Sequence, residues 1–319
     1  MIYPLLLESP VKEHLWGGER LIKEFGLGQV GQRLGGEAWF LSCNNQAENT
    51  VKNGALAGLT LSQAISKMGM DVLGEDVLKF PYFPMSVKLI DAKDRLSVKV
   101  HPDNEYALAQ EGKYGKTKMW YIVDCEEDAN IIYGLKCELN RDELERRIRT
   151  NSLSEVCNFV KVKKGDVFYI RPGTVHAVGK GILLAEIEQN SDLSYRISDY
   201  GRLGIDGKPR PLHISKALDV IHRKRMQRND LEPDLTIYPF GIVKVLSECE
   251  YFKVEHLLLK GKAGLMEEKS FLSVVLLDGE AVLSYLGGTL RLKKGDSLFV
   301  PAKCRITLTG DADVICTHI

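Results

Sequence analysis

Ser97, Lys99 and His101 carry the side chains on which a functional interpretation of this sequence depends. They alternate with apolar residues over the stretch 96–101. Because the side chains of a strand point alternately to its two faces, these three residues share one face and the apolar residues share the other. Pro102 has no backbone N–H to donate, so we expect the strand to end there and His101 to lie at its rim. One face of this strand is therefore equipped for chemistry, with a hydroxyl, an amine and an imidazole.

The composition of the chain indicates which classes of partner this face of the strand could bind. Of the 319 residues, 44% are hydrophobic, which is ordinary for a soluble globular protein. Lys and Arg together number 43, as do Asp and Glu, so the chain lacks the electrostatic footprint of a protein that binds nucleic acid or an acidic membrane surface. A small molecule is the expected partner. The length exceeds that of a usual single core, which predicts two domains or one core with a large insertion.

We expect no membrane or targeting segment and no cysteine chemistry. The first apolar run, residues 5–7, stops at Glu8 and Pro10, far short of a signal-peptide core or a membrane span. The seven cysteines are scattered and form no Cys-x-x-Cys pair, which favours reduced thiols and gives little support for a cysteine nucleophile. These features predict a cytoplasmic protein.

The rest of the chain divides into a mixed part and an all-strand part. Hydrophobic periodicity predicts strands near 84–90, 95–101 and 117–124, and helices over 59–73, capped by Thr60 or Ser62, 141–156 and 211–221. The polar stretch 230–234 is typical of a linker. Beyond residue 235, short strands with Gly turns indicate a sandwich or barrel. We therefore expect one domain over 1–234 and a second over 235–319.

One pattern occurs twice: a Lys-Lys-Gly-Asp turn, a buried four-residue strand, a proline, and a residue four positions after it. The copies are Lys163–Asp166 with Pro172 and His176, and Lys293–Asp296 with Pro301 and Arg305. The second copy lacks the histidine, which suggests one working barrel and one structural barrel. The pattern resembles the second half of a cupin motif, a double-stranded jelly-roll barrel.

Further motifs extend this resemblance to most of the chain. They are Trp16-Gly17-Gly18, the strand 96–101, the turn 115–121, the cupin stretch 172–177 and the segment 186–202. With these motifs the sequence resembles the type I mannose-6-phosphate isomerases in their short bacterial form. The resemblance implies a mainly β fold with two cupin (jelly-roll) barrels, the first with helical insertions and the second degenerate. It also implies aldose–ketose interconversion of mannose 6-phosphate and fructose 6-phosphate.

Members of this family hold one zinc ion with a glutamine, two histidines and a glutamate. The resemblance places the histidines at His101 and His176, whereas Lys99 falls on the glutamine position and Lys118 on the glutamate position. An ammonium group has no lone pair for a metal. It also repels the ion, since two unit charges at about 4 Å cost on the order of 4 kcal/mol at an effective dielectric constant near 20. We therefore expect weak or absent zinc binding.

At the remaining positions of the family site, this sequence has the same residues as the family. The resemblance assigns Ser97 and Lys116 to the substrate site, places Glu186 in its lining and gives Arg196 a part in catalysis. Arg196, Lys116 and Glu186 are thus the expected catalytic set. Lys99 and Lys118 add cations that could attract an anionic sugar phosphate. No protein partner is inferred.

Three functions are compatible with this combination. The first is an isomerase whose metal is lost, altered or held by a reduced site, with a buried ammonium as the electrophile or a neutral lysine as the base. The second is a catalytically silent sugar-phosphate-binding protein, a pseudoenzyme. The third is a structural protein in which Lys99 and Lys118 only pair with Glu186 or Glu188. The matching substrate positions argue against the third, and the isomerase is slightly preferred to the second.

Overall fold

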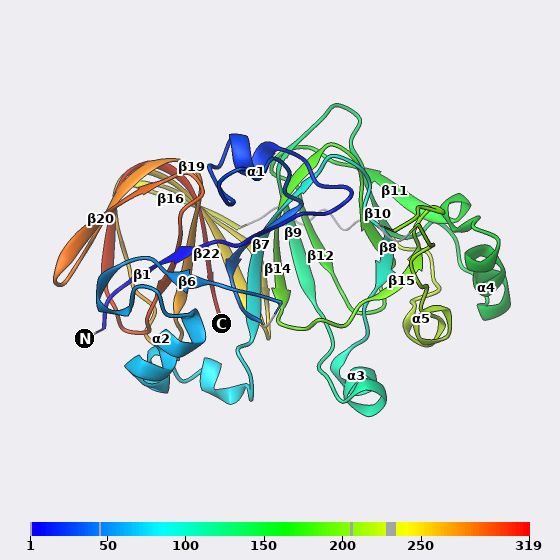
Figure 1. Cartoon of the computed structure of the whole chain (residues 1–319), viewed down its shortest axis with the longest axis horizontal. Helices are drawn as coiled ribbons and strands as arrows, with labels where there is room; N and C mark the ends of the chain where they lie inside the picture. Colours follow the sequence, from blue (N-terminus) through cyan, green and yellow to red (C-terminus); the bar gives the residue numbers. More distant parts are fainter. Residues whose placement is uncertain (1, 45, 205–206, 228–233) are drawn as a thin grey trace.

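Strands predominate in the computed structural model, which describes residues 2–44, 46–204, 207–227 and 234–319. The prediction of a mainly β protein is confirmed. Strands of the middle of the chain form two sheets at one end of the molecule, and strands of the C-terminal part form a larger sheet at the other end (Figure 1). The candidate site residues lie on the first two sheets.

Two sheets in the described part of the chain face each other around a shared interior. The six-stranded sheet has the order β12 (Val167–Ile170), β9 (Lys118–Cys125), β14 (Ile182–Gln189), β7 (Met85–Ala92), β3 (Glu37–Leu41) and β2 (Val11–Lys12). The five-stranded sheet has the order β11 (Cys157–Lys161), β10 (Asn130–Leu135), β13 (His176–Val178), β8 (Val98–Val100) and β15 (Tyr195–Ser198). Ile90 and Trp120 of the first sheet pack with Ile131 and Val178 of the second. This apolar layer fixes the distance between the two sheets.

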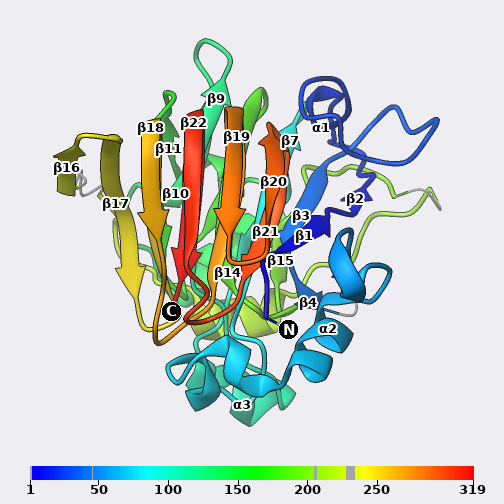
Figure 2. The same ribbon diagram turned by 90° about the vertical axis from the view of Figure 1, so that its left-hand side faces the viewer.

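A third sheet joins both ends of the chain. Within the described residues its path is β16 (Asp234–Tyr238), β17 (Gly241–Cys249), β18 (Phe252–Leu265), β22 (Ile306–His318), β19 (Leu272–Tyr285), β21 (Ser297–Val300), β1 (Leu5–Glu8) and β6 (Thr50–Val51), with β20 (Gly288–Lys293) paired to β19. Figure 2 shows β18, β22 and β19 side by side, with β16 at the outer edge. Because β1 and β6 belong to this sheet, residues 5–51 contribute to it, and the domain boundary at 234/235 stays a prediction.

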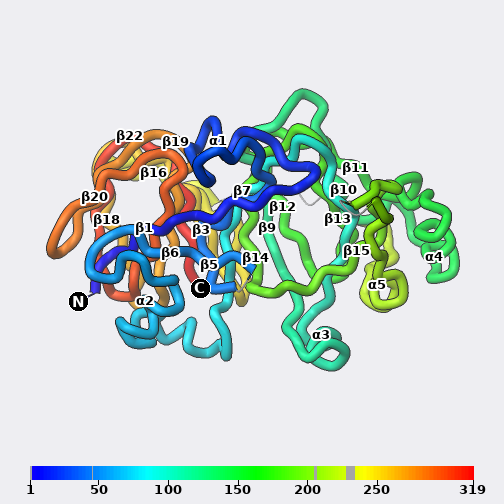
Figure 3. The backbone as a smooth tube through the Cα atoms, in the orientation of Figure 1, coloured from blue at the N-terminus to red at the C-terminus, as the bar shows by residue number. Residues whose placement is uncertain are grey.

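The N-terminal segment connects the third sheet to the site. Figure 3 traces it from β1 toward β3 and β7, and a short hairpin, β4 (Cys43–Asn44) and β5 (Ala47–Glu48), follows β3. Apolar residues such as Leu89 and Ile187 on the outer face of the six-stranded sheet pack with Leu5, Val254 and Val275 of the third sheet. Burial of about 25 cal/mol for each Å² of such apolar surface holds the two layers together.

The helices lie outside the sheets. They are α1 (Arg20–Lys23), α2 (Leu61–Met68), α3 (Asn104–Glu111), α4 (Arg141–Arg149) and α5 (Ile214–Val220), with the 3₁₀ turns η1 (Gly54–Leu56), η2 (Met70–Leu73), η3 (Val77–Lys79) and η4 (Leu153–Glu155). Leu144 of α4 and Leu218 of α5 pack on the outer face of the five-stranded sheet. No helix in the described ranges has the length and apolar composition to cross a membrane.

All three predicted helices are shorter than expected, and the one predicted over 211–221 is reduced to α5. The helix predicted over 59–73 begins after the Thr60 cap, which forms a capping box with Gln63, but Gly69 at φ +94° divides it into α2 and η2. The helix predicted over 141–156 ends at Arg149, because Asn151 adopts the left-handed conformation. The predicted linker 230–234 lies outside the described residues except for Asp234, which begins β16.

The repeated turn has the same geometry in both copies. In the first, Asp166 accepts from the Lys163 backbone N–H at 2.9 Å and Gly165 has φ +89°. In the second, Asp296 accepts from the Lys293 N–H at 2.9 Å, and the glycine that precedes it has φ +90°. The Lys-Lys-Gly-Asp sequence therefore specifies one turn at two places in the chain, because the aspartate caps it and only glycine enters the left-handed position without strain.

Candidate functional site

Strand register brings the charged residues of the six-stranded sheet into adjacent rows. Glu186 on β14 pairs with Lys88 on β7 and with Trp120 on β9, and Glu188 pairs with Lys118 on β9. Residues two apart on a strand share a face, so these side chains all point to the interior between the two sheets. The apolar layer closes one end of this interior, and the charged rows lie at the other.

Four of these side chains form a buried ion-pair cluster with Lys116, which precedes β9 in the chain. The lysine–glutamate cluster consists of Lys88, Lys116, Lys118, Glu186 and Glu188, each at most 6% exposed. Lys118 Nζ lies 2.8 Å from Glu186 and 3.1 Å from Glu188. Lys88 Nζ lies 2.5 Å from Glu188, and Lys116 Nζ lies 3.3 Å from it. Three cations around two carboxylates leave an excess positive charge in a place that excludes water.

The three lysines of the cluster differ in their proton affinity. Burial lowers the pKa of Lys118, but the charges of Glu186 and Glu188 outweigh burial and raise its pKa above the usual range. Lys88 shifts in the same direction for the same reasons. Burial and the like charges of Lys88 and Lys118 lower the pKa of Lys116 to about 8, against the attraction of Glu188. Lys118 is thus a permanent ammonium at neutral pH, whereas Lys116 can exchange its proton.

His101 and His176 lie together beside this cluster, on the opposite sheet. Their ring centroids are 4.8 Å apart, and both side chains are buried. The Nδ1 atoms lie 2.9 Å from the Leu193 carbonyl oxygen and the Thr174 carbonyl oxygen, respectively. Because a carbonyl only accepts, each Nδ1 must donate, and each Nε2 keeps its lone pair. Burial, followed by the charge of Lys118, holds both imidazole pKa values well below the usual range, so both rings are neutral.

These residues do not fit the zinc site of the family. Both imidazoles have the tautomer that a metal requires, and His101 Nε2 is buried without a hydrogen-bond partner. Over the described residues, however, no three His, Cys, Asp or Glu side chains are grouped so that they could hold a metal ion. Lys99 and Lys118, which the resemblance places at the other two ligand positions, offer no lone pair as ammonium groups, and the charge of Lys118 lowers the pKa of both imidazoles. Two neutral donors facing an ammonium group cannot replace a four-donor set.

Lys99 lies next to Arg196 and forms no ion pair with a carboxylate in the described part of the chain. It pairs in register with His176 on one side and with Arg196 on the other. No carboxylate of the described residues lies within 4.0 Å of its Nζ. Burial, followed by the charge of Lys118, lowers the pKa of Lys99. Glu37, on the neighbouring sheet, contributes a carboxylate whose pKa is held at about 2, because His14 and Lys88 outweigh its burial.

Arg196 has unused hydrogen-bonding capacity. One Nη1 bond goes to the Pro211 carbonyl at 3.1 Å, whereas Nε is buried and has no partner in the described part of the chain. Burial, followed by the charge of Arg210, lowers the pKa of the guanidinium. A phosphate or a carboxylate would satisfy such a group.

Ser97 belongs to a second network rather than pointing freely into the interior. Its hydroxyl donates to Asp199 at 2.9 Å and accepts from Arg210 at 2.9 Å. Asp199 also accepts from Arg202 at 2.7 Å, and these partners lower its pKa to about 2 against the effect of burial. Two guanidinium groups on one carboxylate leave this network positive. Four predicted site residues, Lys116, Lys118, Glu186 and Lys99, therefore lie around one interior, with Arg196 and Ser97 beside it.

Sequence analysis missed Lys88, Glu37 and Arg210 as members of the site. Lys88 had a local signal, since it is a charge between the apolar residues Val87 and Leu89 of a buried strand, where an unpaired charge would be costly. Glu37, two residues before Trp39, had a weaker sequence signal. Arg210 lies in a loop, and only the fold brings it to Ser97. Trp120 was noted only as part of a motif, although its Nε1 donates to Glu186 at 2.7 Å.

Two family models match the chain. The model described as phosphomannose isomerase type I, catalytic domain, matches residues 5–121, and the model described as mannose-6-phosphate isomerase, cupin domain, matches residues 242–319. Among curated proteins, mannose-6-phosphate isomerase ManA of Bacillus subtilis is 38% identical and covers 99% of each chain. The mannose-6-phosphate isomerase of Streptococcus mutans is 34% identical over 100% of this chain and 99% of its own.

Solved structures agree with these matches. The crystal structure of the Bacillus subtilis mannose 6-phosphate isomerase has a TM-score of 0.90 at 35% identity, with 99% of each chain covered. A putative mannosephosphate isomerase from Archaeoglobus fulgidus shares the fold, with a TM-score of 0.79 at 24% identity over 99% of this chain and 97% of its own. The fold is of the cupin type, and this chain belongs to the type I mannose-6-phosphate isomerase family.

Proposed function

We propose that this chain binds mannose 6-phosphate and fructose 6-phosphate in the interior described above and interconverts them without a resident zinc ion. One observation carries the proposal: the Lys118 ammonium lies 2.8 Å from Glu186 and 3.1 Å from Glu188, next to the two neutral histidines. A fixed positive charge therefore lies at one of the family's ligand positions. It can act on an oxygen of the substrate as an electrophile.

Substrate binding is supported by the distribution of charge. The phosphate is a dianion near neutral pH, and the cluster, Lys99, Arg196 and the network of Ser97 with Arg210 all carry excess positive charge. Arg196 retains an Nε donor without a partner, and Lys99 has none of the described carboxylates within 4.0 Å. Direct hydrogen bonds to charged groups are worth about 1.5–3 kcal/mol each, so two or three of them give useful affinity.

The isomerisation removes a proton from C2 of the open-chain aldose and returns it to C1, through an enediol. It needs a base and a group that stabilises the oxyanion. Lys116, with its pKa lowered to about 8, is the proposed base, because a substantial fraction is neutral near physiological pH. Lys118 remains charged and is the proposed oxyanion stabiliser. Glu186 holds Lys118 and Trp120 in place, and Arg196 orients the substrate.

Several finer features belong to the same proposal. We propose that the chain acts in the cytoplasm, and that residues 1–234 and 235–319 are two domains. In this division the first domain is a cupin barrel with helical insertions. The second domain is a degenerate barrel that supports the first. The paired Lys-Lys-Gly-Asp turns support an internal duplication, since both copies have the same hydrogen bonds.

A second candidate function is silent binding of the same sugar phosphates. Both carboxylates of the cluster are already paired with lysines, and no described carboxylate of that cluster is free to take a substrate proton. This observation favours a protein that retains affinity and has lost turnover.

A coupled assay of mannose 6-phosphate conversion to fructose 6-phosphate tests the proposal. The protein is treated with a chelator, assayed, and assayed again with added zinc, with zinc content measured in parallel. Equal turnover under both conditions, at roughly 1 to 1,000 per second, would support the zinc-free isomerase. Turnover that requires zinc would contradict it. Absence of turnover, together with saturable sugar-phosphate binding by calorimetry, would establish the second candidate.

A further inference from the structure

A groove lies on the outer face of the five-stranded sheet, away from the candidate site. Its larger part is a cavity of about 290 Å³ lined by Ile132, Ala177, Val178, Phe159, Arg95 and Tyr200, among others. A smaller cavity of about 150 Å³ adjoins it and shares Arg95, Ser154 and Tyr200. None of the side chains of the lysine–glutamate cluster lines either cavity. Neighbouring residues on one strand face opposite sides, so Ala177 lines the groove whereas His176 faces the interior.

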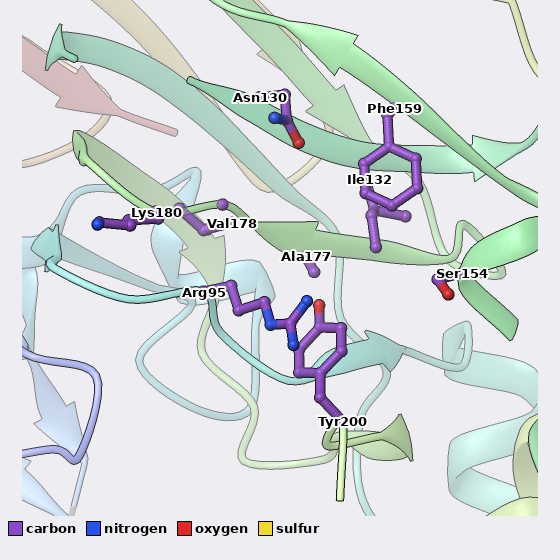
Figure 4. A pocket seen from close by; sticks show the side chains of 10 residues that line it. Arg95, Asn130, Ile132, Ser154, Phe159, Ala177, Val178, Lys180 and Tyr200 are labelled. Atoms are coloured by element: carbon purple, nitrogen blue, oxygen red, sulfur yellow. The ribbon is translucent and has the colours of Figure 1, made fainter. Parts of the chain in front are cut away.

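The lining of the groove is apolar on one side and cationic on the other. Figure 4 shows Ile132 and Phe159 on one side, Arg95 and Tyr200 on the opposite side, and Ala177 between them. Phe159 is 53% exposed, although its ring would be favoured in an apolar contact. An apolar ring of a ligand would fit between these walls.

The cations of the groove have no acidic partners. Arg95 and Lys180 both line the larger cavity, and no carboxylate of the described residues lies within 4.0 Å of either side-chain charge. No acidic residue lines either cavity. The electrostatic complement of this lining is a negatively charged ligand.

The guanidinium group of Arg95 is suited to bind a carboxylate. Its guanidinium carbon lies 3.8 Å from the centroid of the Tyr200 ring, a cation–π contact that restrains the group. Such a contact does not use the N–H groups of the guanidinium as donors to an oxygen acceptor. A fixed planar fork of this kind matches the two oxygens of a carboxylate.

Tyr200 adopts a backbone conformation that is rare for its type. It has φ +57°, in the left-handed region, which is strained for a residue other than glycine. The arginines Arg95 and Arg202 lie over its ring at 3.8 and 5.5 Å. The preceding residue, Asp199, is fixed by its bonds to Arg202 and Arg210. The surroundings therefore hold Tyr200 in place before any ligand arrives, which lowers the entropic cost of binding.

We propose that this groove binds a small organic monoanion with an apolar ring, of the class of an aryl carboxylate. The carboxylate binds Arg95, and the ring lies against Ile132, Ala177 and Phe159. The site is separate from the sugar-phosphate interior and does not depend on the function proposed for that interior.

Benzoate is the probe for the full-length protein, and benzamide is its neutral counterpart of the same shape. Because benzoate is small, it is expected to bind with Kd on the order of 1 mM. Binding is followed by changes in protein-observed NMR spectra. We expect benzamide, the variant Arg95→Gln and the variant Phe159→Ala each to weaken binding about tenfold. Arg33→Gln, at an exposed arginine elsewhere, is the matched control and keeps the wild-type Kd.

Three results would overturn the proposal. The first is the absence of saturable benzoate binding at concentrations up to about ten times the expected Kd. The second is equal affinity of the wild type and Arg95→Gln, both with native spectra. The third is displacement of benzoate by mannose 6-phosphate in a strictly competitive manner, which would place the probe in the sugar-phosphate interior.

Discussion

Lys99 and Arg196 occupy directly opposed positions on β8 and β15, and neither has a described carboxylate within salt-bridge distance. Two neighbouring cations repel each other, and burial adds to the cost. The pKa values of both groups are lowered, by burial first and by like charge second. An anion bound between them would remove this repulsion. We therefore expect a substrate phosphate to bind between these two side chains.

Arg196→Ala is expected to weaken mannose 6-phosphate binding about tenfold or more, because it removes a charge-assisted hydrogen bond of about 1.5–3 kcal/mol. Isothermal titration calorimetry measures the effect. Arg149→Ala, at an exposed arginine of α4, should leave the affinity unchanged. Equal affinity of the wild type and Arg196→Ala would mean that the sugar phosphate binds elsewhere.

The double variant Lys99→Gln with Lys118→Glu is expected to bind one zinc ion per chain tightly. It restores an oxygen donor at each of the two family ligand positions, next to two histidines whose Nε2 lone pairs are already available. Metal content by mass spectrometry after dialysis against a weak chelator measures the gain. Lys67→Gln with Lys224→Glu makes the same charge change at exposed positions. If both double variants contain as little zinc as the wild type, the assignment of positions 99 and 118 is wrong.

Glu188→Gln is expected to destabilise the protein by about 3–5 kcal/mol at pH 7, because Lys88, Lys116 and Lys118 then share one carboxylate. The effect should depend on pH. Cationic neighbours hold the pKa of Glu188 well below its usual value, against burial. Its contribution to stability is therefore present above the unfolded-state pKa of about 4.3 and is lost as pH falls toward the folded-state pKa.

Urea unfolding of the wild type and of Glu188→Gln at several pH values measures this difference. The gap in unfolding free energy should be largest near neutral pH and should narrow below about pH 4.3. A gap that stays constant across this range would show that the loss comes from packing rather than from charge. Glu48→Gln, at a partly exposed carboxylate of β5, provides the control.

The pH profile of isomerisation should rise through a pKa of about 8. Lys116 acts as a base only after it has lost its proton, and burial with neighbouring lysines lowers its pKa to about 8. The measurement is kcat/KM for mannose 6-phosphate between pH 6 and 10. Lys116→Arg keeps the positive charge but cannot deprotonate, so its activity should fall at least about a hundredfold with no such rise. A profile in Lys116→Arg that matches the wild type would exclude Lys116 as the base.

Local patterns predicted the parts of the site that depend on a single strand. The alternation around Lys99 predicted the strand β8, but β8 covers only Val98–Val100 of the predicted 95–101. The pairing of His101 with His176 came from the family resemblance, since those residues are 75 positions apart in the printed sequence. Register across the sheet then brought Lys88 to Glu188, which no periodicity within one strand can predict.

Other differences arise because the sequence does not reveal which partner a polar side chain will find. Ser97 lies on the predicted face, but its hydroxyl is bound to Asp199 and Arg210, a loop residue. The prediction of a helix over 141–156 was wrong at its C-terminal end. The apolar periodicity continues into η4, whereas the backbone at Asn151 is already in the left-handed conformation. In both cases tertiary contacts outweigh the local pattern.

The hydrogen bonds from His101 and His176 to backbone carbonyls have a consequence for the design of metal sites. Hydrogen bonds to main-chain carbonyls orient both imidazoles. The residues at positions 99 and 118 can therefore be replaced by different pairs of metal donors, while His101 and His176 keep their orientation. A small library with Cys, Asp, Glu, Gln and His at these two positions would sample soft and hard coordination spheres within one unchanged β scaffold.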